Sequence, residues 1–208
     1  MKYQMTTLEN KIQELYSYLS ISSPEDIEIY CIAEKLDIWI HYWSRGSKMQ
    51  CTDGLYSIVL DERKIFKEQR QDFFHELGHV IRHVGNQNKM YEHFKNLQEY
   101  QANNFMYHFC VPTFMLLNYN LTNYMNVNDG VDFVSDTFNV TKGFAKKRLV
   151  HFRNQWSQAK SDEEHRRYME SRYPKAAPYS DETNNILALA LEMKAKKRKE
   201  DHQCQNNI

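Results

Sequence analysis

The sequence predicts an α+β fold that is mostly helical and contains a small sheet. Along most of the chain, apolar residues recur at intervals of three and four, the spacing of one face of an amphipathic helix. Two short runs, 38–43 and 54–60, are instead rich in aromatic and β-branched residues, as strands are. A third observation is the pattern H-E-x-x-H from His75 to His79, which places a candidate site on a helix after the second strand.

The composition allows one globular core of ordinary size. The chain has 208 residues, and its 27 lysines and arginines balance its 27 aspartates and glutamates. With no net charge, no overall field favours nucleic acid or an anionic membrane. The four cysteines are scattered without a C-x-x-C pair, which predicts reduced thiols in a cytoplasmic protein. No apolar segment follows the N-terminal residues, so we expect neither a signal peptide nor a transmembrane helix.

Two helices are expected at the start of the chain. Leucines and isoleucines at helical spacing predict an amphipathic helix over about residues 7–19. Ser23 followed by Pro24 is a typical helix start, with serine as the N-cap and proline at the first helical position. This second helix is expected to run to about Leu36.

The two strands are expected to follow. Residues 45–47, Arg-Gly-Ser, end the strand 38–43. The strand 54–60 comes directly before the motif helix. An exposed strand edge can pair with an extended peptide through main-chain hydrogen bonds, so this strand is a candidate to offer its edge to a ligand. A plain strand within the sheet is the alternative.

The H-E-x-x-H pattern indicates a metal site. Residues four apart lie one turn above each other on a helix, so His75 and His79 project from the same face. Two imidazoles at this spacing can bind one Zn²⁺ at about 2.0–2.1 Å, and Glu76 is placed to activate a water molecule. Phe73 and Leu77 belong to an apolar stripe on another face, which favours a buried helix over a surface helix that carries these polar residues without a metal.

The end of this helix carries a further histidine. His83 continues the histidine face by one more turn. Three consecutive turns cannot converge on one ion, because each turn adds about 5.4 Å along the axis. We therefore expect His83 to lie beside the site rather than to bind the metal. Gly85 is expected to end the helix as its C′ residue.

A second helix, expected over about residues 91–109, offers a third ligand. Two histidines leave zinc short of ligands, and one more protein ligand would make an open catalytic site. Glu99 is the candidate, and His108 is the alternative, which would give a site of three histidines. Asn103 lies one turn after Glu99, where its side-chain oxygen could accept the N–H of a ligating histidine. Tyr56, His83 and His108 are candidates to stabilise an oxyanion, and the sequence does not choose among them.

The motif and its downstream partner resemble the ImmA/IrrE family of metallopeptidases. The pattern is HELGH, then Glu-x-x-Ala-Asn-x-Phe, then a proline. In this chain it comprises His75 to His79, Glu99, Ala102, Asn103, Phe105 and Pro112. The likeness covers residues 7–150. Two departures, Phe74 and Met106, fall at packing positions.

The resemblance implies a zincin-like minimal core and a gluzincin-like site. In such a site His75, His79 and Glu99 would bind Zn²⁺, and Glu76 would be the general base of peptide hydrolysis. The family resemblance also implies a protein substrate, a helix-turn-helix repressor of a phage or mobile element. Two alternatives stay open. One is a zinc-dependent protein that masks the repressor without cleaving it, and the other is a DNA-binding regulator that uses residues 129–152.

The rest of the chain predicts three regions. Residues 1–125 are expected to form the metallopeptidase core, 126–155 a segment that resembles a helix-turn-helix and packs on the core, and 156–208 a linker with a C-terminal helical extension. The second helix of the middle region carries basic residues, which would form one face: Lys142, Lys146, Lys147 and Arg148. Helix pairs of this kind are common packing units, so we favour contact with the core or a protein partner over direct DNA binding.

Overall fold

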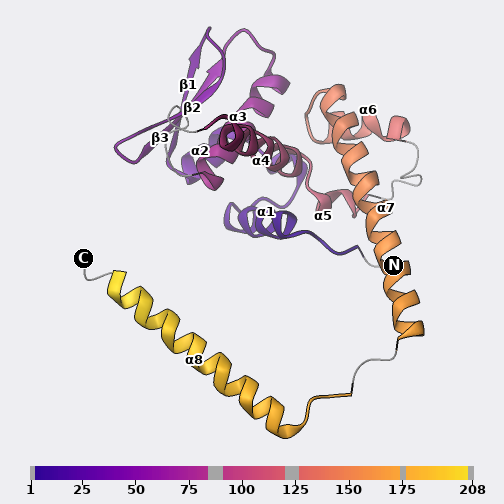
Figure 1. The fold of residues 1–208 in the computed structure, drawn as a ribbon. Coiled ribbons are helices and arrows are strands. Elements are labelled where there is room, and N and C mark those ends of the chain that lie inside the picture. The colour runs from indigo at the N-terminus through magenta and orange to yellow at the C-terminus, as the bar shows by residue number, and fades with distance from the viewer. Residues whose placement is uncertain (1–2, 84–90, 120–126, 174–176, 206–208) are drawn as a thin grey trace. The chain divides into compact units, whose positions relative to one another are not determined.

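The computed structural model describes residues 3–83, 91–119, 127–173 and 177–205, with side chains described as far as residue 196. It confirms a mostly helical α+β fold with a small sheet (Figure 1). The chain divides into two compact units, Met1–Asp162 and Glu163–Ile208. None of the described helices is long and apolar enough to cross a lipid bilayer.

Helix α1, Thr7–Tyr18, begins at a reciprocal cap. The Glu9 amide donates to Thr6 Oγ1 at 3.3 Å, and the Thr6 amide donates to Glu9 Oε2 at 2.7 Å. Two otherwise unpaired helix-end donors are satisfied in this way. The helix therefore begins close to its predicted start.

The second predicted helix is two elements. A 3₁₀ turn over Pro24–Asp26 is followed by α2 at Ile29–Lys35. The carboxylate of Asp26 accepts from the Ser23 amide at 2.8 Å and caps the turn. The backbone then leaves the helical region at Ile27, with φ of −77° and ψ of 75°, and α2 has its own N-cap, Glu28. The single helix predicted over this stretch was therefore wrong.

The sheet has three strands in the order β1–β3–β2. Strand β1, Ile38–Trp43, is parallel to β3, Leu55–Asp61, and β2, Lys48–Thr52, is antiparallel to β3. Asp53 and Gly54 join β2 to β3, with φ of 52° and 82°, as a two-residue hairpin turn requires. Strand β3 is thus the central strand, and the expectation that it offers a free edge was wrong. The free antiparallel edge belongs to β2, which lacks an alternating apolar pattern and was not predicted.

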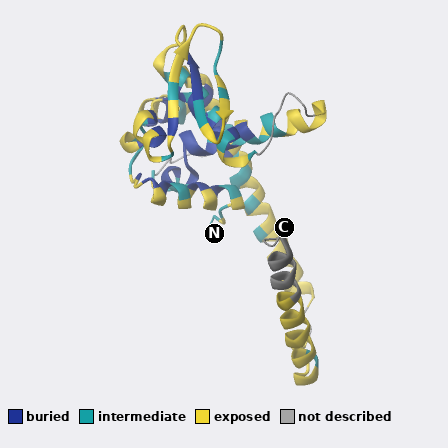
Figure 2. Ribbon diagram, turned by 90° about the vertical axis from the view of Figure 1, so that its left-hand side faces the viewer, coloured by how far each residue is buried: buried dark blue, intermediate teal, exposed yellow. Residues whose placement is uncertain are grey.

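Two helices form the centre of the first unit. They are α3, Phe66–Arg82, and α4, Glu92–Cys110. Phe74 on α3 is fully buried and stacks on Phe109 of α4, with ring centroids 4.7 Å apart. Figure 2 shows the buried residues gathered where helices and sheet meet, while the hairpin end of the sheet is exposed. Helix α3 ends at Arg82, and Gly85, its predicted end, lies outside the described residues.

Four more helices follow in the described part of the chain. These are α5, Thr113–Leu116, α6, Val127–Thr137, α7, Lys142–Arg172, and α8, Asp181–Gln205. Asn139, with φ of 48°, forms the turn between α6 and α7. The helix pair predicted in the middle region is present. Residues 156–172, predicted as the start of a linker or a loosely docked extension, continue α7 as one helix.

A buried polar cluster ties the start of α7 to the rest of the first unit. Arg148 is fully buried and donates Nε to the Val111 carbonyl at 3.0 Å and Nη2 to Thr113 Oγ1 at 2.7 Å. The Thr113 hydroxyl in turn donates to the carboxylate of Glu9 on α1. Arg148 was predicted on an exposed basic face, and that prediction was wrong. It anchors α7 instead.

His108 of α4 lies against the same cluster. Its Nδ1 is 3.6 Å from Glu9 Oε1, and the ring is almost fully buried. Burial, together with the charge of Arg148, lowers the pKa of His108 to about 2. The ring is therefore neutral in the folded protein at physiological pH.

We predict that replacing His108 reduces the loss of stability in mild acid. Below about pH 6.5 the unfolded chain protonates this histidine and the folded chain does not, so stability falls as the pH falls. Between pH 6.5 and pH 5 the free energy of unfolding should fall by roughly 2 kcal/mol because of this histidine. Urea unfolding of the metal-free protein at pH 7 and pH 5 should show a smaller difference for His108→Gln than for the parent. The exposed His93→Gln should behave as the parent does, and equal differences in all three proteins would contradict the prediction.

Candidate metal centre

Helices α3 and α4 bring three potential metal ligands together. The Nε2 atoms of His75 and His79 are 3.2 Å apart. Glu99 Oε2 lies 3.2 Å from His75 Nε2, and Glu99 Oε1 lies 3.6 Å from His79 Nε2. Within the described part of the chain, no other three histidine, cysteine or acidic side chains offer ligand atoms this close together.

These three side chains, His75, His79 and Glu99, form what we call the donor group, and they suit a zinc ion. Bonds of about 2.0–2.1 Å in a tetrahedral arrangement place neighbouring ligand atoms about 3.3 Å apart. The two imidazole nitrogens have this separation, and each lies 3.2–3.6 Å from a different oxygen of Glu99. One ligand atom from each of the three residues lies within 4.8 Å of the others, which is close enough for one ion to bind all three after a small adjustment. Burial lowers the pKa of His79, which keeps the ring neutral and its electron pair available to a cation. Two imidazoles and one carboxylate leave one tetrahedral position for water or substrate, as in catalytic zinc sites.

A close helix contact sets the distance between the histidines and Glu99. A Cβ atom placed on Gly78 would lie 3.1 Å from Ala102 Cα and 3.2 Å from the Ala102 carbonyl oxygen. Glycine on α3 and alanine on α4 therefore let the two backbones touch. Gly78 directly precedes His79, and Glu99 lies one turn before Ala102. The contact thus brings the carboxylate within reach of both imidazoles.

Glu76 is held beside the donor group by the sheet. Its Oε2 accepts the main-chain N–H of Met49 on β2 at 2.8 Å. Burial raises the pKa of Glu76 to about 7, the Met49 amide opposes the rise, and the nearby charges of Glu99 and Asp72 add to it. A carboxyl group that titrates near neutrality can both take up and return a proton. The position and environment of Glu76 suit a general base.

Two further residues, Asn103 and His83, were predicted to lie near the metal ligands. Asn103 is exposed, and its Nδ2 donates to the main-chain carbonyl of Glu99 at 2.8 Å. The predicted bond from Asn103 to a histidine stays a prediction. His83 ends α3 in an extended conformation, with its ring centroid 5.3 Å from that of His79 and its Nε2 3.2 Å from the Gln98 carbonyl.

The three candidates for an oxyanion donor are separated by the structure. His108 contacts Glu9 in the buried cluster, and Tyr56 packs against the hydrophobic core. His83 has a ring contact with His79 and is only half-buried. Of the three, His83 is the one with a described contact to the donor group. The alternative of a three-histidine site through His108 has no geometric support.

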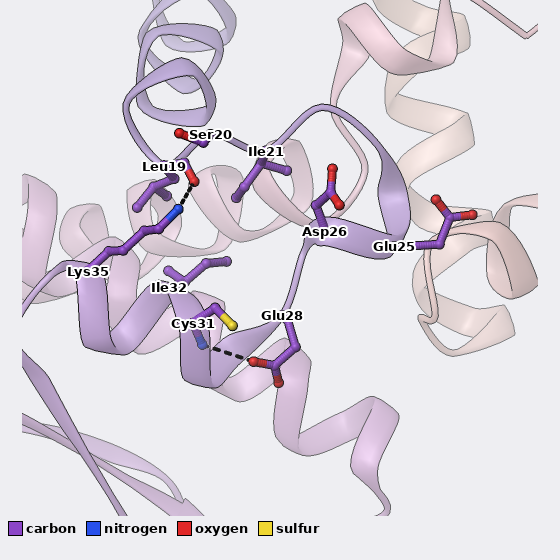
Figure 3. Close-up of a pocket in the computed structure, with 9 residues that line it drawn as sticks. All are labelled: Leu19, Ser20, Ile21, Glu25, Asp26, Glu28, Cys31, Ile32 and Lys35. Carbon is purple, nitrogen blue, oxygen red and sulfur yellow. Dashed lines mark hydrogen bonds between the residues drawn. The ribbon is translucent and has the colours of Figure 1, made fainter.

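A separate cleft of about 340 Å³ lies between α2 and the segment that joins it to α1, and it contains an exposed cysteine, Cys31 (Figure 3). Glu28 accepts the Cys31 amide at 2.9 Å, and its interaction with the thiol raises the pKa of Cys31. Lys35, the nearest cation of the cleft, donates to the Leu19 carbonyl. A thiol that resists ionisation is a poor nucleophile, so the chemistry of this protein is best sought at the donor group.

Comparison with known proteins points to the same region. The model of the IrrE N-terminal-like domain, a family of M78 peptidases, matches residues 33–150, which include His75, Glu76, His79 and Glu99. The phage-like element PBSX protein XkdA of Bacillus subtilis (strain 168) is 48% identical over 148 residues, covering 71% of this chain and 74% of that protein. The uncharacterized protein YqaB of the same organism is 40% identical over 154 residues, covering 74% of this chain and 88% of that protein.

We predict that the purified protein carries about one zinc ion per chain. His75→Ala, His79→Ala and Glu99→Ala should each lose stoichiometric zinc, because each removes one of three protein ligands. His108→Gln should keep it. The metal content is measured by elemental analysis after dialysis. Retention of zinc by Glu99→Ala together with its loss from His108→Gln would contradict the ligand assignment.

A second prediction concerns the helix contact. Gly78→Ala should destabilise the protein by roughly 1–3 kcal/mol, because the added methyl group meets backbone atoms that cannot simply rotate away. It should also weaken zinc binding, since α4 must move away from α3. Gly143→Ala is the control, because no atom lies within 4 Å of its added Cβ, and it should be neutral or stabilising by about 0.5–1 kcal/mol. Urea unfolding and competition with a zinc chelator measure the two effects, and similar behaviour of both variants would refute this explanation.

Proposed function

The chain belongs to the ImmA/IrrE family, and on that premise we propose that it is a zinc-dependent endopeptidase that cleaves a helix-turn-helix repressor. One observation carries the proposal. His75, His79 and Glu99 converge in the spacing of a zinc site, while Glu76 lies beside them without belonging to the group. A site that only binds a metal has no need of such a carboxylate.

The side chains divide the chemistry among them. His75, His79 and Glu99 would hold the metal. When bound, zinc supplies Lewis acidity, which polarises a peptide carbonyl and makes water acidic enough to react near neutral pH. Glu76 accepts the proton of the attacking water and returns it to the leaving amine. The Met49 amide fixes the carboxylate while it does so.

The edge of β2 supports a polypeptide substrate. The Met49 N–H that binds Glu76 points away from β3, along the free edge of the sheet. An extended peptide can add to such an edge by main-chain hydrogen bonds, with little dependence on its sequence. A peptide bound there would run past Glu76. An open edge accepts a segment from the middle of a chain, which favours an endopeptidase.

One relative supports the biological setting of the proposal. XkdA is described as a protein of a phage-like element, and we propose that this chain also serves such an element. Its substrate would be the element's repressor, in the cytoplasm, and cleavage would end lysogeny. Direct DNA reading by residues 129–152 has less support, because Arg148 is buried and Lys142 is paired with Asp132 at 2.8 Å.

We predict that Glu76→Gln separates cleavage from masking. The variant should keep zinc, fold and repressor binding, because Glu76 is not a ligand, and should cleave the repressor at least about 100-fold more slowly. The assay incubates the protein with the repressor encoded beside its gene and follows fragments by mass spectrometry. Glu68→Gln, exposed on the same helix, is the matched control and should cleave normally.

The same pair of variants decides the alternative in cells. If Glu76→Gln relieves repression as fully as the parent protein, the chain acts by masking the repressor and the peptidase proposal fails. Loss of relief with retained repressor binding supports cleavage.

A further inference from the structure

A cleft of about 470 Å³ lies beside His75, between α3, α4 and the start of α7. His75 and Asp72 line it from α3, Met106 and Tyr107 from α4, and Phe144 and Lys147 from α7. One wall of the cleft is therefore a proposed zinc ligand. Another wall comes from the start of α7, for which the proposed chemistry gives no role.

The base of the cleft is apolar and firmly held. The rings of Tyr107 and Phe144 have centroids 4.7 Å apart, and Phe144 and Met106 are buried. Arg148, one turn beyond Phe144, is bonded to the Val111 carbonyl and holds this end of α7 against the core. An apolar base of this kind, with polar side chains around it, can hold the carbon atoms of one ligand side chain.

The charges of the cleft favour an anionic group. Asp72 is already matched, since its carboxylate accepts Lys64 Nζ at 2.6 Å and also the Ser47 hydroxyl. Lys147 is exposed, and among the described residues no carboxylate lies within ion-pair distance of it.

We propose that this cleft binds a substrate side chain next to the scissile bond and that Lys147 makes it select an acidic residue. The inference rests on the proposed function, because it takes the group around His75 as the reaction centre. An acidic side chain would lay its carbons on Met106 and Phe144 and its carboxylate beside the Lys147 ammonium. A basic side chain in the same place would leave two like charges together.

The test uses the zinc-loaded full chain with Glu76→Gln, which should hold peptides without cutting them. It is immobilised and offered a random-sequence peptide library, and retained peptides are sequenced by mass spectrometry. The same selection is run after adding Lys147→Glu, and after adding Lys146→Glu, a neighbouring exposed lysine that does not line the cleft. The parent protein is then given the retained peptides, and the cleaved bond fixes the position of the selected residue.

Enrichment of aspartate or glutamate at one position beside the cleaved bond is the expected result. Lys147→Glu should shift the ratio of acidic to basic residues there by roughly tenfold towards basic ones, since a change of about 1.4 kcal/mol is tenfold. Lys146→Glu should leave the ratio unchanged. Absence of retained peptides, absence of acidic enrichment, or equal effects of the two lysine variants would overturn the subsite. Selective retention without cleavage by the parent would uphold the subsite and refute the peptidase function.

Discussion

The contact between Gly78 and Ala102 is the constraint on which the rest of the site depends. Two helices packed through larger side chains lie about 8–10 Å apart. Here the absence of a side chain on Gly78 lets α4 lie directly on α3, and Glu99 reaches both histidines. Further along the same two helices, buried Phe74 stacks on Phe109 and adds an aromatic contact between them. Without this contact, Glu99 on α4 would not reach His75 and His79 on α3, and the two histidines would lack a third ligand.

The sheet contributes one hydrogen bond of consequence, from the Met49 amide to Glu76. An acid buried beside two other acidic groups tends to stay protonated, and a general base must be able to ionise. The amide favours the ionised form and fixes its position, while burial keeps the pKa close to neutral. The two-residue turn at Asp53 and Gly54 sets the register of β2 and so places this amide. A short, exposed strand thus positions the group proposed to move the proton.

The donor group could be predicted from the sequence because its geometry is local to two helices. The spacing of His75 and His79 defines a helix face, and the pattern around Glu99 adds the partner helix. Strand β2 could not be predicted, because Lys48–Thr52 carries no apolar alternation and pairs only through its backbone. The prediction that Arg148 belongs to a basic helix face was wrong for a different reason. Its charge predicts exposure, and only the acceptors at Val111 and Thr113, distant in sequence, make its burial favourable.

The burial of Arg148 argues against DNA reading by the helix pair α6–α7. A pair that reads DNA needs its second helix to project basic side chains into a groove. In this chain the second helix, α7, buries Arg148 in the core. Its Phe144 and Lys147 line a cleft that His75 also lines. A buried charge with fixed acceptors tolerates little movement, because separating them would leave the charge unpaired. The start of α7 is therefore held as a wall of this cleft, where the proposed selection of a substrate side chain would take place.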